Sequence, residues 1–219
     1  MTAAAGLEYL HNQRIIHRDV KSANMLLTDD GWCVARLSAA PRHWVREPTE
    51  YAEYPQVPCG RCCSVKISDF GLSRIRTAST VMKSVHIAGS PAWMAPEAMK
   101  DNNVDFKCDV YAFAIVIWEL VYLAVPWESL ALVQVYHQVV VKEQRPQTNK
   151  PPAYAIPPEL IGLMAEAWVP EPARRPSMEE IRYRLKLMQL GSENPSLNQS
   201  PLHSERYSPA IGESSLESF

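Results

Sequence analysis

The sequence has little net charge and lacks the usual signals for export or membrane insertion. Its 22 basic and 24 acidic side chains leave a formal net charge of −2, so no binding to nucleic acid or to an anionic membrane is expected. The first residues lack a basic segment followed by an apolar one, so no secretory signal is expected. The longest apolar stretch, residues 110–125, is interrupted by Glu119 and falls short of the roughly 18 apolar residues that a membrane-spanning helix needs.

A disulfide pattern is also missing. The five cysteines show no pairing pattern, which favours a reducing compartment, and a cytoplasmic location is expected. Three of them stand in the segment CGRCC at residues 59–63, but no second cysteine pair lies at a spacing that would complete a zinc site. Free thiols are therefore preferred there over a metal site. What remains is a chain of 219 residues that is 47% hydrophobic, enough to bury the core of one domain.

Short strands and one long interruption mark the first part of the chain. Residues 1–10 are typical of the end of a helix, and strands are expected at residues 15–16 and 25–28 before a hairpin turn signal, Asp30–Gly31. The returning strand, VKISDF at residues 65–70, comes only after residues 33–64, which contain four prolines and no sustained periodicity. An irregular segment of roughly 30 residues far exceeds the usual loop of about 4–6 residues, so we interpret it as an insertion at the tip of the hairpin.

The remainder up to about Leu190 is expected to be helical. Residues 110–123 are apolar on nearly every side, which is typical of a buried central helix. Further helices are expected after Pro157–Pro158 and after Ser177, which begins the Ser-x-x-Glu pattern of a capping box. The serine-rich residues 191–219 are expected to form a disordered tail.

Three short motifs follow one another along the chain: HRD at residues 17–19 with Asn24 after it, DFG at residues 69–71, and APE at residues 95–97. Together they resemble the catalytic loop, the metal-binding loop and the end of the activation segment of eukaryotic protein kinases. About ten specified residues in this order and spacing make a chance match negligible. The resemblance covers residues 1–32 and 65–190. It implies a mainly α fold (α+β), the large C-terminal lobe of a protein kinase with a small β-hairpin.

The resemblance implies ATP and Mg²⁺ as cofactors and gives four residues a role. Phosphoryl transfer spreads negative charge over the moving group and depends on alignment more than on covalent help. Asp19 would accept the proton of the substrate hydroxyl and orient it, and Lys21 would neutralise charge on the transferred phosphate. Asn24 and Asp69 would hold Mg²⁺, because oxygen ligands suit a hard cation.

Lys21 and two longer segments indicate which group of protein kinases the chain resembles. Tyrosine kinases have Ala-Arg in this part of the catalytic loop, so HRDVKSAN at residues 17–24 resembles a kinase that acts on protein serine or threonine. GSPAWMAPEAM at residues 89–99 and DVYAFAIVIWEL at residues 109–120 resemble the tyrosine-kinase-like group of Ser/Thr kinases, the mixed-lineage and Raf-like branch. In that group the residue at the position of Ser90 contacts the catalytic aspartate and lysine.

The activation segment, residues 69–97, carries hydroxyl side chains that an upstream kinase would phosphorylate: Thr77, Ser79, Thr80 and Ser84. Arg18 would then grip the phosphate with two hydrogen bonds and order the segment. The alternative is that these residues are ordinary loop hydroxyls.

Other matches are structural. Glu97 resembles the family glutamate that pairs with a buried arginine, which here is Arg175. Asp109 would anchor the backbone of the catalytic loop. His17 is interpreted as a packed structural histidine rather than an acid–base group.

The part of a kinase that holds the nucleotide from the other side is missing from the sequence. No Gly-rich loop, no V-A-I-K lysine and no hinge precede His17, so we expect a truncated catalytic domain with the N-terminal lobe absent. By itself such a chain would transfer phosphate poorly and would expose apolar surface. Two alternatives stay open. One is a non-catalytic kinase-like module that binds partners, and the other is a small metal-binding or docking element built by the insertion.

Overall fold

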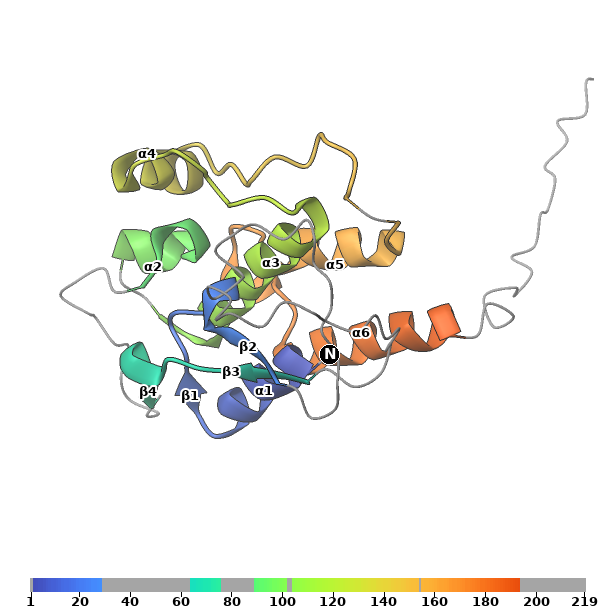
Figure 1. Cartoon of the computed structure of the whole chain (residues 1–219). Helices are drawn as coiled ribbons and strands as arrows, with labels where there is room; N and C mark the ends of the chain where they lie inside the picture. The colour runs from blue at the N-terminus through green and yellow to red at the C-terminus, as the bar shows by residue number, and fades with distance from the viewer. Residues whose placement is uncertain (1, 29–63, 76–88, 102–103, 154, 194–219) are drawn as a thin grey trace, which may run out of the picture.

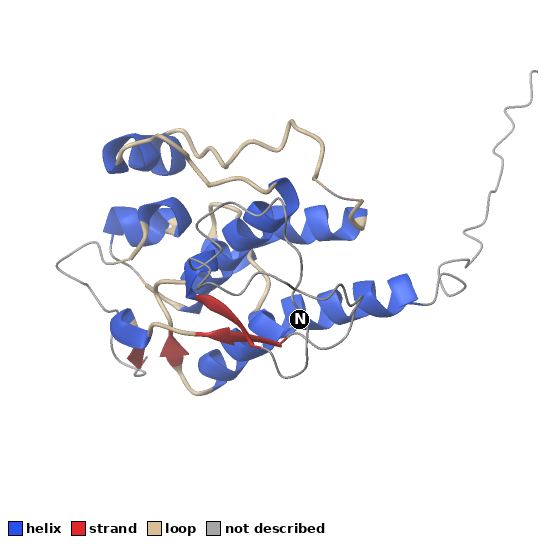
Figure 2. Cartoon of the chain, in the orientation of Figure 1, coloured by secondary structure: helices blue, strands red, loops and turns tan. Residues whose placement is uncertain are grey.

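The computed structural model describes residues 2–28, 64–75, 89–101, 104–153 and 155–193, and the structural statements below concern these residues. The fold is mostly helical with two small two-stranded sheets (Figure 2). Helix α3 runs through the middle, with the β2–β3 pair and α1 on one side and α4 on the other (Figure 1). The helices are α1 (Thr2–Asn12), α2 (Pro96–Asp101), α3 (Phe106–Tyr122), α4 (Leu132–Tyr136), α5 (Pro158–Ala167) and α6 (Met178–Glu193).

Short strands and single helical turns connect these helices and carry most of the motif residues. The strands are β1 (Ile15–Ile16), β2 (Met25–Thr28), β3 (Ser64–Ile67) and β4 (Arg74–Ile75). The 3₁₀ turns are η1 (Ser22–Asn24), η3 (Phe70–Leu72), η4 (Pro91–Trp93) and η6 (Pro172–Arg174), and η5 (His137–Val141) is a π-helical turn that continues α4.

Helix α3 is the centre of the core, as its apolar sequence predicts. Asp105 caps its start by accepting a hydrogen bond from the Lys107 backbone N–H at 2.7 Å. Ala114 and Ile115 in its middle have no exposed surface. The helix ends at Leu123, whose backbone lies in the left-handed region with φ of 48°. The prediction of a buried central helix is confirmed.

The two strands that flank the interruption pair with each other. β2 and β3 are antiparallel, with Met25 opposite Ile67 and Thr28 opposite Ser64, so residues 29–63, which lie outside the described residues, connect two neighbouring strand ends. This confirms that the two strands form one hairpin. The predicted length of the second strand was wrong, because β3 ends at Ile67 and the chain turns at Asp69, where φ is 63°.

The first and last helices pack against each other. Helix α1 buries Ala3, Ala4, Leu7 and Leu10, the spacing of one helical face. A Cβ atom on Gly6 would lie 3.0 Å from the Ile67 side chain, so a larger residue there would require the Ile67 methyl group to shift. Glu8 of α1 forms an ion pair with Arg182 of α6.

The last two helices begin at the predicted signals. Helix α5 starts at Pro158 itself, since the missing N–H of a proline has no helical partner in the first turn. The Ser177 hydroxyl accepts a hydrogen bond from the Glu180 backbone N–H at 3.1 Å ahead of α6. Helix α6 continues to Glu193, three residues past the expected boundary at Leu190. Of the helices in the described ranges, none is long and apolar enough to cross a membrane.

Candidate active site

The loop after β1 takes its shape from an aspartate on the central helix. Asp109 Oδ2 accepts a hydrogen bond from the His17 backbone N–H at 2.8 Å, and its Oδ1 accepts one from the Arg18 N–H at 2.9 Å. Arg18 has a left-handed backbone with φ of 73°, which turns the chain toward Asp19. The His11 ring Nε2 lies 2.9 Å from the same carboxylate. Asp109 thus holds the loop backbone from inside the core.

His17 is enclosed by the second motif. Its side chain has no exposed surface, its Nε2 donates to the Ser68 carbonyl at 3.0 Å, and its ring packs edge-on against Phe70 with centroids 5.2 Å apart. A histidine enclosed in this way links the HRD segment to the DFG segment by packing.

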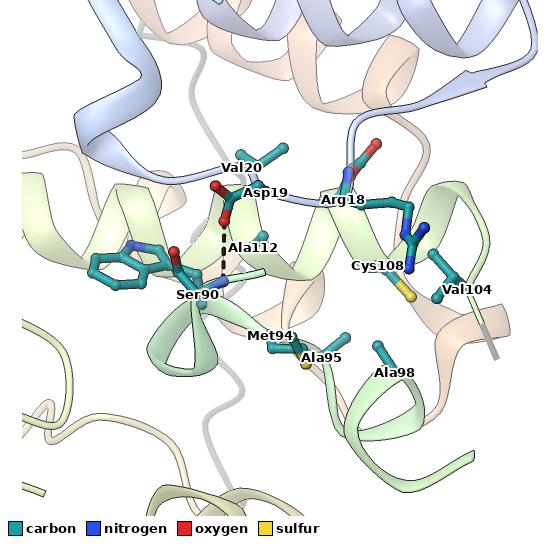
Figure 3. Close-up of a pocket in the computed structure, with 12 residues that line it drawn as sticks. Arg18, Asp19, Val20, Ser90, Met94, Ala95, Ala98, Val104, Cys108 and Ala112 are labelled. Atoms are coloured by element: carbon teal, nitrogen blue, oxygen red, sulfur yellow. Dashed lines mark hydrogen bonds between the residues drawn. The ribbon is translucent and has the colours of Figure 1, made fainter. Parts of the chain in front are cut away.

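Asp19 lies where the catalytic loop meets the segment that contains Ser90. Its Oδ2 accepts hydrogen bonds from Lys21 Nζ at 2.7 Å and from Asn24 Nδ2 at 3.1 Å. Its Oδ1 accepts one from the Ser90 backbone N–H at 3.0 Å, the contact drawn in Figure 3. Lys21 Nζ also donates to the Ser90 hydroxyl at 2.8 Å. Asp19, Lys21 and Ser90 therefore form a closed set of contacts.

These contacts determine the charge of Asp19. Burial alone raises the pKa of this carboxyl, but hydrogen bonds from Lys21 and Ser90, the charge of Lys21 and the Asn24 amide outweigh it and bring the pKa below the ordinary 3.8. The group is therefore an anion at neutral pH. It is a good hydrogen-bond acceptor and a weak base.

Asn24 and Asp69 offer oxygen atoms on adjoining segments. The Asn24 side chain donates from its nitrogen to the Asp19 carbonyl at 2.8 Å and to the Asp19 carboxylate, and among the described residues no hydrogen bond uses its amide oxygen. Ser68 donates to the Asn24 carbonyl from its N–H at 2.9 Å and its hydroxyl at 3.1 Å. Asp69 follows directly and is exposed.

This donor set fits Mg²⁺ that is shared with phosphate oxygens. One carboxylate, one amide oxygen and a nucleotide match the way proteins bind this ion. Within the described parts of the chain, no three His, Cys, Asp or Glu residues gather into a metal cage. The segment CGRCC lies outside those parts.

A second positively charged group lies on the other side of the loop. Arg18 extends toward Cys108 and away from Asp19, in a shallow pocket that Met94 and Ala98 also line (Figure 3). Burial and the neighbouring charge of Arg74 lower the pKa of Arg18. Because the positive charge of Arg74 acts on Arg18, an anion near both residues would be favoured. Thr77, Ser79, Thr80 and Ser84, whose phosphates would supply it, lie outside the described residues.

A bidentate ion pair joins the third motif to the C-terminal part of the chain. Arg175 donates to the two carboxylate oxygens of Glu97 at 2.6 and 2.8 Å, and only 2% of Arg175 is exposed. The arginine also donates to the carbonyls of Val169 at 2.9 Å and Pro170 at 3.0 Å. The Cys108 thiol donates to the same Glu97 carboxylate at 3.2 Å.

One protein family model matches most of the chain. Residues 1–185 fit the family model for protein tyrosine and serine/threonine kinases. The chain belongs to the protein kinase family. It is 33% identical over 201 residues to the serine/threonine-protein kinase CTR1 of Arabidopsis thaliana, covering 91% of this chain and 20% of that protein. A probable serine/threonine-protein kinase of Dictyostelium discoideum is 36% identical over 179 residues, which are 81% of this chain and 15% of that protein.

A third relative leads to the same family. The serine/threonine/tyrosine-protein kinase HT1 of Arabidopsis thaliana is 32% identical over 176 residues, or 80% of this chain and 35% of that kinase. These kinases confirm the resemblance to the tyrosine-kinase-like group that the motifs indicate. The chain spans about a third or less of the length of the kinases named here.

One member of this kinase site was not predicted from the sequence. Glu119 of α3 is completely buried and accepts hydrogen bonds from the Ser22 hydroxyl at 3.0 Å and from the Trp93 indole N–H at 2.7 Å. Its signal was present, because a single acidic residue interrupts an otherwise apolar helix. An acidic residue in an apolar helix indicates that a polar partner lies in the core, but it does not identify that partner.

Proposed function

We propose that this chain is the large, C-terminal lobe of a cytoplasmic Ser/Thr protein kinase that transfers the γ-phosphate of ATP to serine or threonine of protein substrates. The proposal treats residues 1–190 as one lobe with an insertion at residues 33–64, and residues 191–219 as a tail. The observation that carries it is the set of contacts joining Asp19, Lys21 and Ser90.

The arrangement suits in-line transfer to a hydroxyl. The substrate oxygen attacks the γ-phosphorus, the bond from that phosphorus to the bridging oxygen of ADP breaks, and the hydroxyl proton passes to Asp19. Because the pKa of Asp19 is lowered, the residue orients the hydroxyl more than it activates it. Lys21, held between Asp19 and Ser90, places a positive charge beside the moving phosphate.

Asn24 and Asp69 are the residues that would hold Mg²⁺, which when bound neutralises the phosphates of the nucleotide. The amide oxygen of Asn24, which has no partner within the described part of the chain, and the exposed carboxylate of Asp69 support this assignment. Arg18 and Arg74 would receive a phosphate that an upstream kinase places on the activation segment. The effect of the Arg74 charge on the pKa of Arg18, which it lowers together with burial, supports that role.

The proposal is tested by restoring a nucleotide-binding lobe and measuring transfer. The full chain is fused behind the N-terminal kinase lobe of CTR1, and incorporation of ³²P from γ-labelled ATP into Ser/Thr peptides is followed. We expect transfer by the fusion, little transfer by the chain without the added lobe, and none after Asp19→Asn. Glu166→Gln, on the exposed surface, is the matched control and should leave transfer unchanged.

Three outcomes would contradict the proposal. A folded fusion that transfers no phosphate would favour the non-catalytic binding module. Transfer that survives Asp19→Asn would show that Asp19 does not carry the reaction. Phosphate found on tyrosine in place of serine and threonine would overturn the substrate assignment.

A further inference from the structure

Glu119 is an acidic side chain where the packing favours apolar ones. It lies in the last third of α3, and no part of it is exposed. Trp118 and Val121 beside it are buried, as is most of the helix. A buried carboxylate is costly unless hydrogen bonds compensate it, so the contacts of Glu119 must offset a substantial desolvation cost.

Its two oxygens reach two different segments. Oε1 accepts from the hydroxyl of Ser22, the residue after Lys21. Oε2 accepts from the indole N–H of Trp93, three residues after Ser90. One carboxylate therefore bridges the turns η1 and η4, and the two residues that it holds, Ser22 and Trp93, are 71 positions apart in the chain.

Within each bridged turn, a backbone hydrogen bond fixes the first residue relative to the last. The Asn24 N–H donates to the Lys21 carbonyl at 3.1 Å, which closes η1. The Trp93 N–H donates to the Ser90 carbonyl at 3.1 Å, which closes η4. A shift at Trp93 is thus passed to Ser90 and from there to the Asp19 carboxylate.

The two turns are consequently joined on both sides. Facing the pocket, Lys21 donates to the Ser90 hydroxyl and the Ser90 N–H donates to Asp19. Facing the core, Glu119 holds Ser22 and Trp93. The pocket-side contacts involve the partly exposed Lys21, while Glu119 belongs to α3, most of whose residues are buried.

We propose that Glu119 is a positioning residue for phosphoryl transfer: acting through Ser22 and Trp93, it sets the distance between the turns that carry Lys21 and Ser90. The proposal rests on the proposed kinase function for its effect on catalysis. It assigns Glu119 no contact with substrate or nucleotide. Removing both acceptor oxygens should loosen Ser90 from Asp19 while α3 itself stays folded.

The chemistry of the side chain supplies a conservative variant. Glu119→Leu removes both acceptors and leaves the Trp93 indole N–H without its partner. Glu119→Gln keeps one acceptor oxygen for Trp93, and its amide N–H can donate to the Ser22 hydroxyl, so the bridge is rebuilt. Val116→Ala, which creates a small cavity in the same helix, is the matched control for general destabilisation.

Amide hydrogen exchange of the full ¹⁵N-labelled chain tests the bridge directly. The reporter is the Ser90 N–H, and the Val116 N–H in α3 is the internal reference. We expect Glu119→Leu to speed exchange at Ser90 by about tenfold while Val116 is unchanged, and Glu119→Gln to restore wild-type exchange at Ser90. Val116→Ala should not speed Ser90 selectively. Should Glu119→Leu fail to fold, Trp93→Phe removes one donor and is expected to act in the same direction.

The opposite results would overturn the proposal. Exchange that accelerates equally at Ser90 and Val116 would mean that Glu119 only stabilises the fold. Unchanged exchange at Ser90 in both Glu119→Leu and Trp93→Phe would mean that the bridge does not position it.

Kinetics of the two-lobed fusion provide the second readout. Glu119→Leu should lower kcat by about tenfold and leave the KM for ATP within about twofold, because the bridge acts on the transfer geometry. An unchanged kcat would overturn the catalytic part of the proposal. If the unmodified fusion transfers no phosphate, the proposed function fails, and the exchange experiment still decides whether Glu119 positions Ser90.

Discussion

Asp19 is a charged side chain with only 7% of its surface exposed. Its charge is kept by short contacts with Lys21, Asn24 and the Ser90 N–H, which together outweigh the cost of burial. The folded state therefore binds the Asp19 proton more weakly than the unfolded state does. This difference links the site to the pH dependence of stability.

Stability should fall in acid partly through this residue. Because the folded pKa of Asp19 lies below 3.8, its contribution is present above that pH and is lost as the pH falls through the lowered pKa. The measurement is the free energy of urea unfolding between about pH 6 and pH 3, for wild type and Asp19→Asn. The wild type should lose more stability than the variant as the pH falls below about 4. Parallel curves would show that the contacts do not favour the anion.

Ser90 is predicted to act through its hydroxyl as well as its backbone. Ser90→Ala removes the acceptor for Lys21 but keeps the N–H that donates to Asp19, so kcat of the two-lobed fusion should fall about 2- to 10-fold. Ser90→Thr keeps the hydroxyl and serves as the control. A loss in the alanine variant as large as that of Asp19→Asn would contradict this division of roles.

At the scale of elements, two ion pairs connect the C-terminal part of the chain to earlier helices, and they differ in how deeply they are buried. Arg175 before α6 pairs with Glu97 of α2 inside the fold, where the arginine side chain has no exposed surface. Arg184 of α6 pairs with Glu166 of α5 on the surface, where the Glu166 side chain is 53% exposed. Water competes for the second pair and barely reaches the first.

The two pairs should therefore differ widely in their effect on stability. Arg175→Met leaves the Glu97 carboxylate without its buried partner and should cost about 3–5 kcal/mol of unfolding free energy. Glu166→Gln, the surface control, should cost less than about 1 kcal/mol. Denaturant unfolding of the two variants beside the wild type measures both. Similar losses would mean that burial does not separate them.

At the scale of the whole molecule, the long connection between the paired strands β2 and β3 affects the free energy of unfolding. Thr28 and Ser64 are opposite each other, so residues 29–63 connect two strand ends that a two-residue turn could also join. Closing a loop of n residues costs entropy that grows with the logarithm of n.

Shortening this connection should stabilise the protein. Replacing residues 29–63 by Asn-Gly keeps the strand register, and the shorter loop should add about 2 kcal/mol of unfolding free energy. Thermal unfolding of the shortened chain and the full chain checks this. A shortened chain that does not fold, or that unfolds at a lower temperature, would show that residues 29–63 contribute contacts of their own.

Local patterns made much of this protein predictable. The apolar run around Ile115 needs no partner to indicate a buried helix. The turn signal Asp30–Gly31 after residues 25–28, with a second strand resuming at residue 65, was enough to pair two strands across the interruption. The spacing from His17 to Asn24 identified the family, because residues so near in the chain hold their relative positions within one loop. The end of β3 was missed, since the left-handed turn at Asp69 has no glycine to announce it.

The sequence by itself determined the family, the central helix and which residues gather in the catalytic loop, because these depend on neighbours within a few residues. Only the tertiary structure decided that Glu119 bridges Ser22 and Trp93, whereas the contact of Ser90 with Asp19 was already implied by the family resemblance. Those contacts join segments far apart in the chain. Their partners follow from how α3 packs between the two turns, which no local pattern specifies.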